Sequence, residues 1–339
     1  MRFIQEKCTR CGECLYKCNY LDLDLEEAKK EIINLIDLGD SFILSECVTC
    51  YACNEYCKEN ANPFDLIASL QEINNTFNID KNLLKMLEKQ YAPYEFTLNL
   101  ENKGPLMSQC AFFKSHSKLF KGDLFENLTL IGGRSVFCNL IYLHTGQYSL
   151  IEKRAPLIVE NVKKALKNFI SKELICFHDE CYLFFQKFAP AFGIDVPFKP
   201  IHLYEYLVRY LQKNKEKVNL LKMKIAFQRS CSTRLTPEKD DFLDEIFRLI
   251  GVERVKRKFD YENAMCCQAP LLGFLNKKEL AIENQNKNIK DALDNGAEAM
   301  IFICPMCYDT LKAQCEKNGL IPLFITDLCR IALGELSIS

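Results

Sequence analysis

Apolar residues at helical spacing mark two segments in the N-terminal part of the chain. The spacing predicts a helix over residues 24–38, with Asp24 as its N-cap and Gly39 at its end. The apolar face of this helix consists of Leu25, Ala28, Ile32, Leu35 and Ile36. A second helical stretch is predicted over residues 63–87. The pattern therefore predicts that the N-terminal domain is built from helices rather than from a β-hairpin.

Beyond residue 100, short apolar runs alternate with amphipathic stretches. Strands are predicted over residues 225–228, 300–303 and 321–325. Helices are predicted over residues 202–210, 242–250, 280–293 and 326–333, the third of them stopped by Gly296. Such alternation is typical of parallel sheets, which bind ligands in the loops at the carboxyl ends of their strands.

The C-terminal two-thirds also shows weak self-similarity over a period of about 120 residues. Residues 107–182 and residues 224–308 carry cysteines in a related order, and a strand and a helix are predicted after each. We therefore expect three domains, over residues 1–95, 96–215 and 216–339. The predicted fold class is a multidomain α+β protein, in which a helical domain precedes two repeated α/β units.

Eight cysteines near the N-terminus form two runs of identical spacing. The first run is Cys8, Cys11, Cys14 and Cys18, and the second is Cys47, Cys50, Cys53 and Cys57. This spacing matches bacterial two-cluster ferredoxins, except that Asn19 and Lys58 replace the usual proline. There, the fourth cysteine of each run binds the other cluster. The predicted [4Fe–4S] ligand sets are Cys8, Cys11, Cys14 and Cys57, and Cys47, Cys50, Cys53 and Cys18. Paired zinc knuckles are the alternative.

Five further cysteines form a single-double-CxxC array near the C-terminus. They are Cys231, Cys266, Cys267, Cys304 and Cys307. Ordinary zinc and cubane sites use at most four protein thiolates. A fifth thiolate indicates a larger or less symmetric iron–sulfur assembly.

The earlier copy keeps only part of this array. Its double cysteine is replaced by Phe137-Cys138, and the first cysteine of its CxxC by His178. The groups that remain are Cys110, Cys138, Cys181 and either His178 or Cys176. Four such groups suit a cubane cluster or a tetrahedral zinc ion, and a third alternative is that this copy binds no metal.

Composition and charge narrow the class of protein. The 339 residues include 19 cysteines and carry a net charge of −1, which favours neither nucleic acid nor an anionic membrane as a partner. Without an apolar leader, so many thiols indicate a reducing, cytoplasmic location. The sequence predicts no membrane span, so any membrane association would be peripheral and through a partner. No glycine-rich phosphate loop follows a strand, which places flavin or nicotinamide chemistry on another protein.

The five-cysteine array resembles the CCG domain of the heterodisulfide reductase family, and the N-terminal runs resemble that family's small iron–sulfur subunit. The same fused layout resembles iron–sulfur subunits of anaerobic glycerol-3-phosphate, glycolate, lactate and some succinate dehydrogenases. The resemblance implies an α-helical ferredoxin domain with two [4Fe–4S] clusters, a degenerate first CCG-like unit and an intact second CCG unit. It also implies that the five cysteines hold a non-cubane [4Fe–4S] cluster. Gln268 departs from the family's glycine, so we expect the turn there to differ locally.

Two functions follow from this resemblance. The first is an iron–sulfur electron-transfer subunit of an oxidoreductase complex in anaerobic metabolism, relaying electrons between a flavoprotein dehydrogenase, or another redox subunit, and the cluster on the CCG motif. A membrane quinone-reactive subunit is a further expected partner. The alternative is catalytic reduction of a disulfide at the non-cubane cluster, with Cys267 as the candidate catalytic residue. The sequence leaves open whether Arg229 and Arg234 hold an anion, offset cluster charge or lie solvated in the loop.

Overall fold

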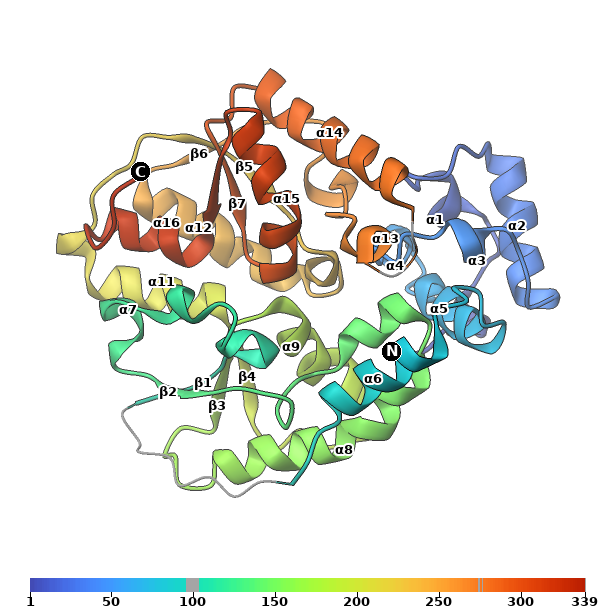
Figure 1. Ribbon diagram of the computed structural model, residues 1–339, viewed down its shortest axis with the longest axis horizontal. Coiled ribbons are helices and arrows are strands. Elements are labelled where there is room, and N and C mark those ends of the chain that lie inside the picture. The colour runs from blue at the N-terminus through green and yellow to red at the C-terminus, as the bar shows by residue number, and fades with distance from the viewer. Residues whose placement is uncertain (96–103, 274, 276, 339) are drawn as a thin grey trace.

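The computed structural model describes residues 1–95, 104–273, 275 and 277–338, and Figure 1 shows their arrangement. A group of short helices forms the N-terminal region, and two parallel sheets with their covering helices form the rest. The predicted domain boundary after residue 95 lies at the edge of a segment outside the described residues. No helix in the described ranges is long and apolar enough to cross a bilayer.

The N-terminal region is helical, as the apolar spacing predicts. Its helices are α1 (Glu13–Tyr16), α2 (Leu25–Asp37), α3 (Ile43–Glu46), α4 (Ala52–Tyr56), α5 (Pro63–Ile73) and α6 (Lys81–Tyr91). At the start of α2, Asp24 Oδ1 accepts the Glu27 backbone N–H at 2.9 Å, and Glu27 Oε2 accepts the Asp24 N–H at 2.9 Å. This capping box confirms the predicted start of the helix.

The prediction of one helical stretch over residues 63–87 is wrong, because the chain forms two helices there. Asn75 and Asn78 both have positive φ, which interrupts the helical path after α5. Asp80 then starts α6 by accepting the N–H groups of Asn82 and Leu83 at 3.0 and 2.9 Å. Asparagine tolerates the left-handed region better than most residues, so this break has a local cause.

The first sheet contains β1 (Leu106–Ser108), β2 (Thr129–Ile131), β3 (Glu173–Cys176) and β4 (Lys199–His202). Its strands are parallel and lie in the order β2-β1-β3-β4. The helices of this part are α7 (Asp123–Glu126), α8 (Tyr148–Ala165), α9 (Asp179–Leu183), α10 (Ala189–Ala191) and α11 (Leu203–Lys213). His202 caps α11, because its Nδ1 accepts the Tyr204 N–H at 3.1 Å.

The second sheet has the equivalent strand order, β6-β5-β7-β8, and is also parallel. Its strands are β5 (Lys224–Gln228), β6 (Glu253–Arg254), β7 (Ala299–Phe302) and β8 (Ile321–Phe324). The helices are α12 (Asp240–Ile250), α13 (Ala269–Gly273), α14 (Lys278–Asp294), α15 (Pro305–Lys317) and α16 (Ile325–Ala332). The predicted strands and helices of this part are present, with ends that differ by one or two residues.

A continuous apolar core joins the two sheets. Helices α11 and α12 pack against each other, one from each part (Figure 1). Phe177, which follows β3, stacks on Phe324 at the end of β8 with ring centroids 5.4 Å apart. Phe177 and Phe324 are fully buried, so the two parts share one interior rather than a hydrated contact.

One buried carboxylate also joins the two parts. Asp179 Oδ1 accepts a hydrogen bond from His202 Nε2 at 2.8 Å, within the first part. Asp179 Oδ2 accepts from the Ser230 and Thr233 hydroxyls of the second part at 2.5 and 2.8 Å. The Lys239 ammonium lies 3.5 Å from Oδ1. Burial raises the pKa of Asp179, but Lys239 and these hydrogen bonds outweigh it and hold the pKa well below the usual range.

Replacing this carboxylate should destabilise the protein. We expect Asp179→Asn to lower the free energy of unfolding by roughly 3–5 kcal/mol, because it leaves the buried Lys239 without its counter-charge. The lowered pKa means that the contribution is complete above the usual carboxyl range and is lost as the pH falls below it. Anaerobic urea unfolding, followed by circular dichroism at several pH values, measures both effects.

The matched control is Asp309→Asn. Asp309 also faces a histidine, with His116 Nε2 at 3.0 Å, but its side chain is 56% exposed. This change should cost less than about 1 kcal/mol. Equal losses for Asp179→Asn and Asp309→Asn would show that the buried contacts of Asp179 do not hold the two parts together.

Candidate metal centres

The structure gathers the eight N-terminal cysteines around two cavities. Cys8, Cys11, Cys14 and Cys57 line the first cavity, which we call the outer site, and Cys11 there is exposed. Cys14, Cys18, Cys47, Cys50 and Cys53 line the second cavity, the inner site. The fourth cysteine of each run thus lies with the other run, and the crossed ligand sets themselves stay a prediction. Cys14 borders both cavities, so the outer and inner sites are neighbours.

The backbone around the two runs follows one pattern. Arg10 and Thr49, each two residues after the first cysteine of its run, have φ of 57° and 56°. Gly12 and Tyr51, each one residue after the second cysteine, have φ of 76° and 63°. Such left-handed residues turn successive N–H groups toward one point, a geometry common at phosphate and iron–sulfur sites. The Thr49 N–H points at Cys47 Sγ at 3.3 Å, so the thiols and backbone of the inner site fit a cluster.

Gly12 shows how tightly the first run is built. A Cβ atom at this position would lie 2.5 Å from the Lys29 nitrogen and 2.7 Å from the Ala28 carbonyl carbon of α2. Only glycine avoids that clash while keeping a positive φ. The backbone of helix α2 therefore packs directly against the loop that carries Cys11 and Cys14.

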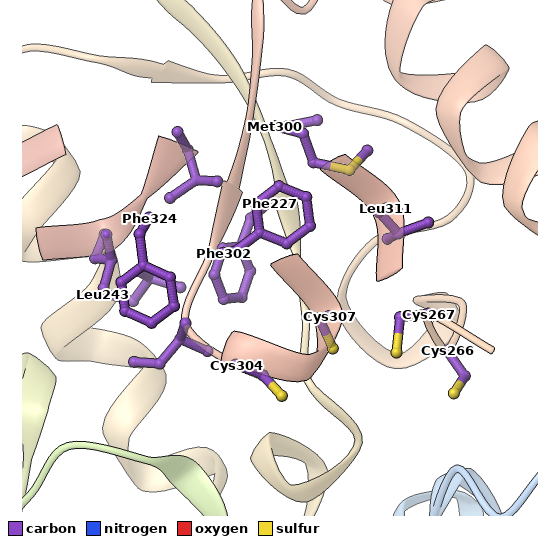
Figure 2. Packing of buried hydrophobic residues seen from close by; sticks show 14 of the residues in the cluster. Phe227, Leu243, Cys266, Cys267, Met300, Phe302, Cys304, Cys307, Leu311 and Phe324 are labelled. Atoms are coloured by element: carbon purple, nitrogen blue, oxygen red, sulfur yellow. The ribbon is translucent and has the colours of Figure 1, made fainter. Parts of the chain in front are cut away.

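The five C-terminal cysteines line one cavity, here called the CCG site. Cys231 follows β5, and Cys304 and Cys307 lie at the start of α15 after β7, so these three stand at the carboxyl ends of parallel strands. Cys266 and Cys267 come from the loop before α13 and complete the group. Figure 2 shows the sulfurs of four of these cysteines pointing the same way, away from the apolar side chains of the sheet. The fifth, Cys231, has its Sγ 3.4 Å from Cys266 Sγ.

Two thiols of the CCG site are acidic. Hydrogen bonds from Cys266 and Cys307 lower the pKa of Cys267 to about 6, although burial opposes this. A hydrogen bond from Cys307, together with the nearby His178, lowers the pKa of Cys304 to about 6 against the same opposition. The pKa values of the other three thiols, Cys231, Cys266 and Cys307, are instead raised well above the usual range. The main cause for Cys231 is its hydrogen bond to Cys266, and for Cys307 it is the pair of hydrogen bonds to Cys267 and Cys304. For Cys266, the hydrogen bond with Cys231 lowers the pKa, but the hydrogen bond with Cys267 and burial outweigh it. Thiolates, not thiols, bind metal, so binding here would release protons from these three thiols.

Gln268 adopts the left-handed conformation that glycine would adopt, with φ of 69°. Its side chain is buried, and its Nε2 donates to the Cys266 carbonyl at 2.9 Å. Its backbone N–H points at Cys266 Sγ at 3.4 Å, as the Thr49 N–H does at Cys47. The expected local difference is thus absent from the backbone, because the glutamine side chain supplies a bond that offsets its strain.

The first part of the chain holds a smaller group of thiols. The sulfurs of Cys110, Cys138 and Cys181 lie within 4.8 Å of one another, and all three are buried. Burial raises the pKa of Cys110, but hydrogen bonds from Cys138, Cys181 and His178 outweigh it and lower the pKa well below its usual range. These three thiols, with the His178 imidazole beside Cys110 as a fourth donor outside the set of three, would suit a tetrahedral zinc ion or an iron–sulfur cluster. We call these four residues the Cys3His group.

His178 and Cys176 differ in their placement. Neither residue belongs to the set of three mutually close donor atoms. Cys176 Sγ points at the Leu174 carbonyl oxygen, 3.8 Å away, whereas His178 makes a hydrogen bond with Cys110. His178 Nε2 lies 3.3 Å from Cys304 Sγ, while Glu180 Oε2 lies 3.8 Å from its Nδ1. His178 therefore lies between Cys110, one of the three clustered thiols, and Cys304 of the CCG site.

The CCG cavity lies between the two parts of the chain, and both line it. Its apolar walls are Phe112, Phe137, Ile141, Ala269, Pro270 and Met306. His144 and Glu180 also line it, with His144 Nε2 3.7 Å from Glu180 Oε1. Their joint position depends on the fold, and the sequence analysis missed both residues.

A salt-bridge cluster connects the N-terminal region to the CCG site. Glu55, on α4 between Cys53 and Cys57, accepts hydrogen bonds from Arg229 and Arg234, each at 2.5 Å. Both arginines are buried, so the interpretation of solvated loop residues is wrong. We call these three residues the Glu55 clamp. It holds α4 against the turn that carries Cys231.

One comparison with known proteins, a family match, agrees with this chemistry. Residues 225–312 match the family described as the CCG cysteine-rich domain, and that range includes all five cysteines of the CCG site. No curated protein matches the chain. Among solved structures, glutamate racemase isoform RacE1 from Bacillus anthracis is similar with a TM-score of 0.37 and 14% identity, covering 68% of this chain and 79% of that one. The family match and the clustered cysteines support an iron–sulfur CCG protein.

The crossed ligand sets can be tested with two complementary variants. Cys57→Ser should open the outer site and make Cys8, Cys11 and Cys14 reactive toward an alkylating agent in the anaerobic holoprotein. Cys18→Ser should instead expose Cys47, Cys50 and Cys53, because a thiolate that binds metal is protected from alkylation. Mass spectrometry of the labelled peptides reads out both. The opposite pairing of variant and labelled run would show that each run binds its own cluster.

The Cys3His group can be tested with another matched pair. If the Cys3His group holds a metal, Cys181→Ser should release it, because the substitution takes away one of the three clustered sulfurs. Cys176→Ser changes an equally buried thiol outside the group and should leave the metal content unchanged. Elemental analysis gives the number and kind of metal ions lost. Unchanged metal in both variants would mean that this group binds none.

Proposed function

We propose that this protein is an iron–sulfur electron-transfer subunit of a heterodisulfide reductase-like oxidoreductase complex. The observation that carries the proposal is the succession of thiol groups along the molecule. The outer site borders the inner site through Cys14. The inner site borders the CCG site through Tyr20, which lines the inner cavity and has its hydroxyl oxygen 2.6 Å from the Cys266 nitrogen. A row of adjacent redox sites is what a relay requires.

The protein groups around these sites suit [4Fe–4S] clusters. Bound there, such clusters would take up and release single electrons. The backbone N–H groups of Thr49, Ala61 and Gln268 point at cysteine sulfurs at 3.3–3.4 Å. Hydrogen bonds of this kind stabilise negative charge on the sulfurs and so tune the potential. Five thiols at the CCG site favour the non-cubane cluster there.

The Glu55 clamp sets the charge at the junction of the inner and CCG sites. Two arginines meet one glutamate there, and Asp240 pairs with Arg229 at 2.9 Å, so the four ionised groups balance. Arg229 is thus paired with Asp240 as well as Glu55, whereas Arg234 has Glu55 as its one salt-bridge partner among the described residues. Arg234 lies close enough to Cys50 and Cys231 to counter the negative charge of both. A buried cation at this place favours an electron moving between the two sites.

The outer site is the natural entry point for a partner. Its Cys11 is exposed, whereas four of the five CCG cysteines are buried. We propose that a flavoprotein dehydrogenase or another redox subunit docks here, in the cytoplasm, with a membrane quinone-reactive subunit as a further partner of the complex. The two-electron chemistry of the substrate then belongs to that partner.

Disulfide reduction at the CCG site is the second candidate function. The observation in its favour is the cavity between the two parts, where Cys267 and Cys304 have a pKa of about 6. Cleavage of a disulfide to two thiols consumes two electrons and two protons. The relay would supply the electrons, and the His144–Glu180 pair lies where it can pass protons.

One experiment separates the two functions. The purified holoprotein, reduced by a strong artificial donor, should accept electrons without sustained turnover of small disulfides, and it should co-purify with a flavoprotein. Sustained disulfide turnover that Cys267→Ser abolishes would instead establish the catalytic function. Cys329→Ala is the control, because Cys329 is a buried thiol of α16 that does not line the CCG cavity.

A further inference from the structure

Tyr20 makes a direct contact between the inner site and the CCG site. It follows Cys18 by two residues and lines the inner cavity. Its hydroxyl oxygen accepts the backbone N–H of Cys266 at 2.6 Å. The contact joins residues 246 positions apart in the sequence, one on each side of the junction.

We propose that Tyr20 is the positioning residue through which the inner site is coupled electronically to the CCG site. This inference rests on the proposed relay function. The path runs along the chain from Cys18 to Tyr20, through the ring, and across one hydrogen bond to Cys266. It consists of covalent bonds and a single short hydrogen bond that ends on the backbone of a candidate ligand. The Glu55 clamp also connects the two sites, but that route is longer, because it passes through an arginine side chain and further backbone before it reaches Cys231.

Two other hydrogen bonds between the N-terminal region and the second part end on residues that are not candidate ligands. Tyr56 donates its hydroxyl to the Glu262 carbonyl oxygen at 2.8 Å, and Asn19 Nδ2 donates to the Asn263 carbonyl oxygen at 3.0 Å. These contacts dock the two parts but stop short of a candidate ligand. Within the described residues, the Tyr20 bond alone joins residues 1–95 to one of the five CCG cysteines.

The transfer along this path moves one electron and no proton. The electron leaves the reduced inner site and enters the oxidised CCG site. The outer site then reduces the inner site again. An external donor supplies the electrons, and in the experiment below this donor is dithionite. The step requires neither an electron nor a proton from Tyr20 itself. The residue acts by keeping its ring and hydroxyl in contact with Cys266.

The test compares Tyr20→Phe with Tyr56→Phe. Both substitutions remove one hydroxyl from the same junction and keep the ring, but only the first breaks the bond to Cys266. Anaerobic holoprotein receives less than one equivalent of dithionite, and rapid freeze-quench EPR follows the spin signals of the sites. We expect the CCG signal to appear several-fold more slowly in Tyr20→Phe and at the wild-type rate in Tyr56→Phe. Redox titrations should give the same midpoint potentials and line shapes in all three proteins.

Three outcomes would overturn the inference. They are an unchanged rate in Tyr20→Phe, an equal slowing in both variants, and a slowing that a shifted midpoint potential fully explains. If Tyr20→Phe lowers the iron content, a fluorinated tyrosine at position 20 weakens the hydroxyl oxygen as an acceptor and must slow the transfer in the same way. Wild-type protein that binds no iron, or whose CCG site never receives electrons, would refute the relay itself rather than the part played by Tyr20.

Discussion

The buried carboxylate of Asp179 fixes how the two sheets meet, and the geometry of two thiol groups depends on it. Its neighbours in sequence include His178 and Cys181 of the Cys3His group. Its partners Ser230 and Thr233 lie on either side of Cys231. Since a buried charge is tolerated only with all its partners in place, the two sheets cannot slide without a large loss of stability. The cavity between the sheets therefore keeps one shape.

The Glu55 clamp holds the N-terminal region against the second sheet and its loops, as Asp179 holds the two sheets against each other. Both arginines of the clamp come from the loop around Cys231, and Glu55 lies within the second cysteine run. The clamp and the thiol groups are thus built from the same short segments. A chain that brings these segments together assembles the junction and the two sites beside it in one step, which explains why charged residues are retained in an otherwise apolar interior.

Much of the fold and of the site could be predicted because it depends on local signals. The capping box of α2, the buried strands 225–228 and 300–303, and the position of thiols at strand ends all follow from short-range patterns. The remainder depends on contacts between distant segments. The burial of Arg234 requires Glu55, which is 179 residues away, and Tyr20 finds Cys266 only in the folded chain. The backbone conformation at Gln268 could not be predicted for another reason. A non-glycine residue is strained at positive φ, but the amide of this side chain also donates a hydrogen bond to the Cys266 carbonyl that stabilises the turn.

The exposure of Cys11 makes the outer site the most accessible of the thiol groups to oxidants. An edge that is open to a donor protein is equally open to dioxygen and peroxide, which attack accessible iron and thiolate first. The CCG cysteines lie farther inside, behind the inner site and the Glu55 clamp. In the proposed relay, oxidative damage should therefore begin at the outer site and stop electron entry from the proposed donor while the interior is still intact. When the outer site is oxidised first, repair is needed only there, at the site that repair proteins can reach most easily.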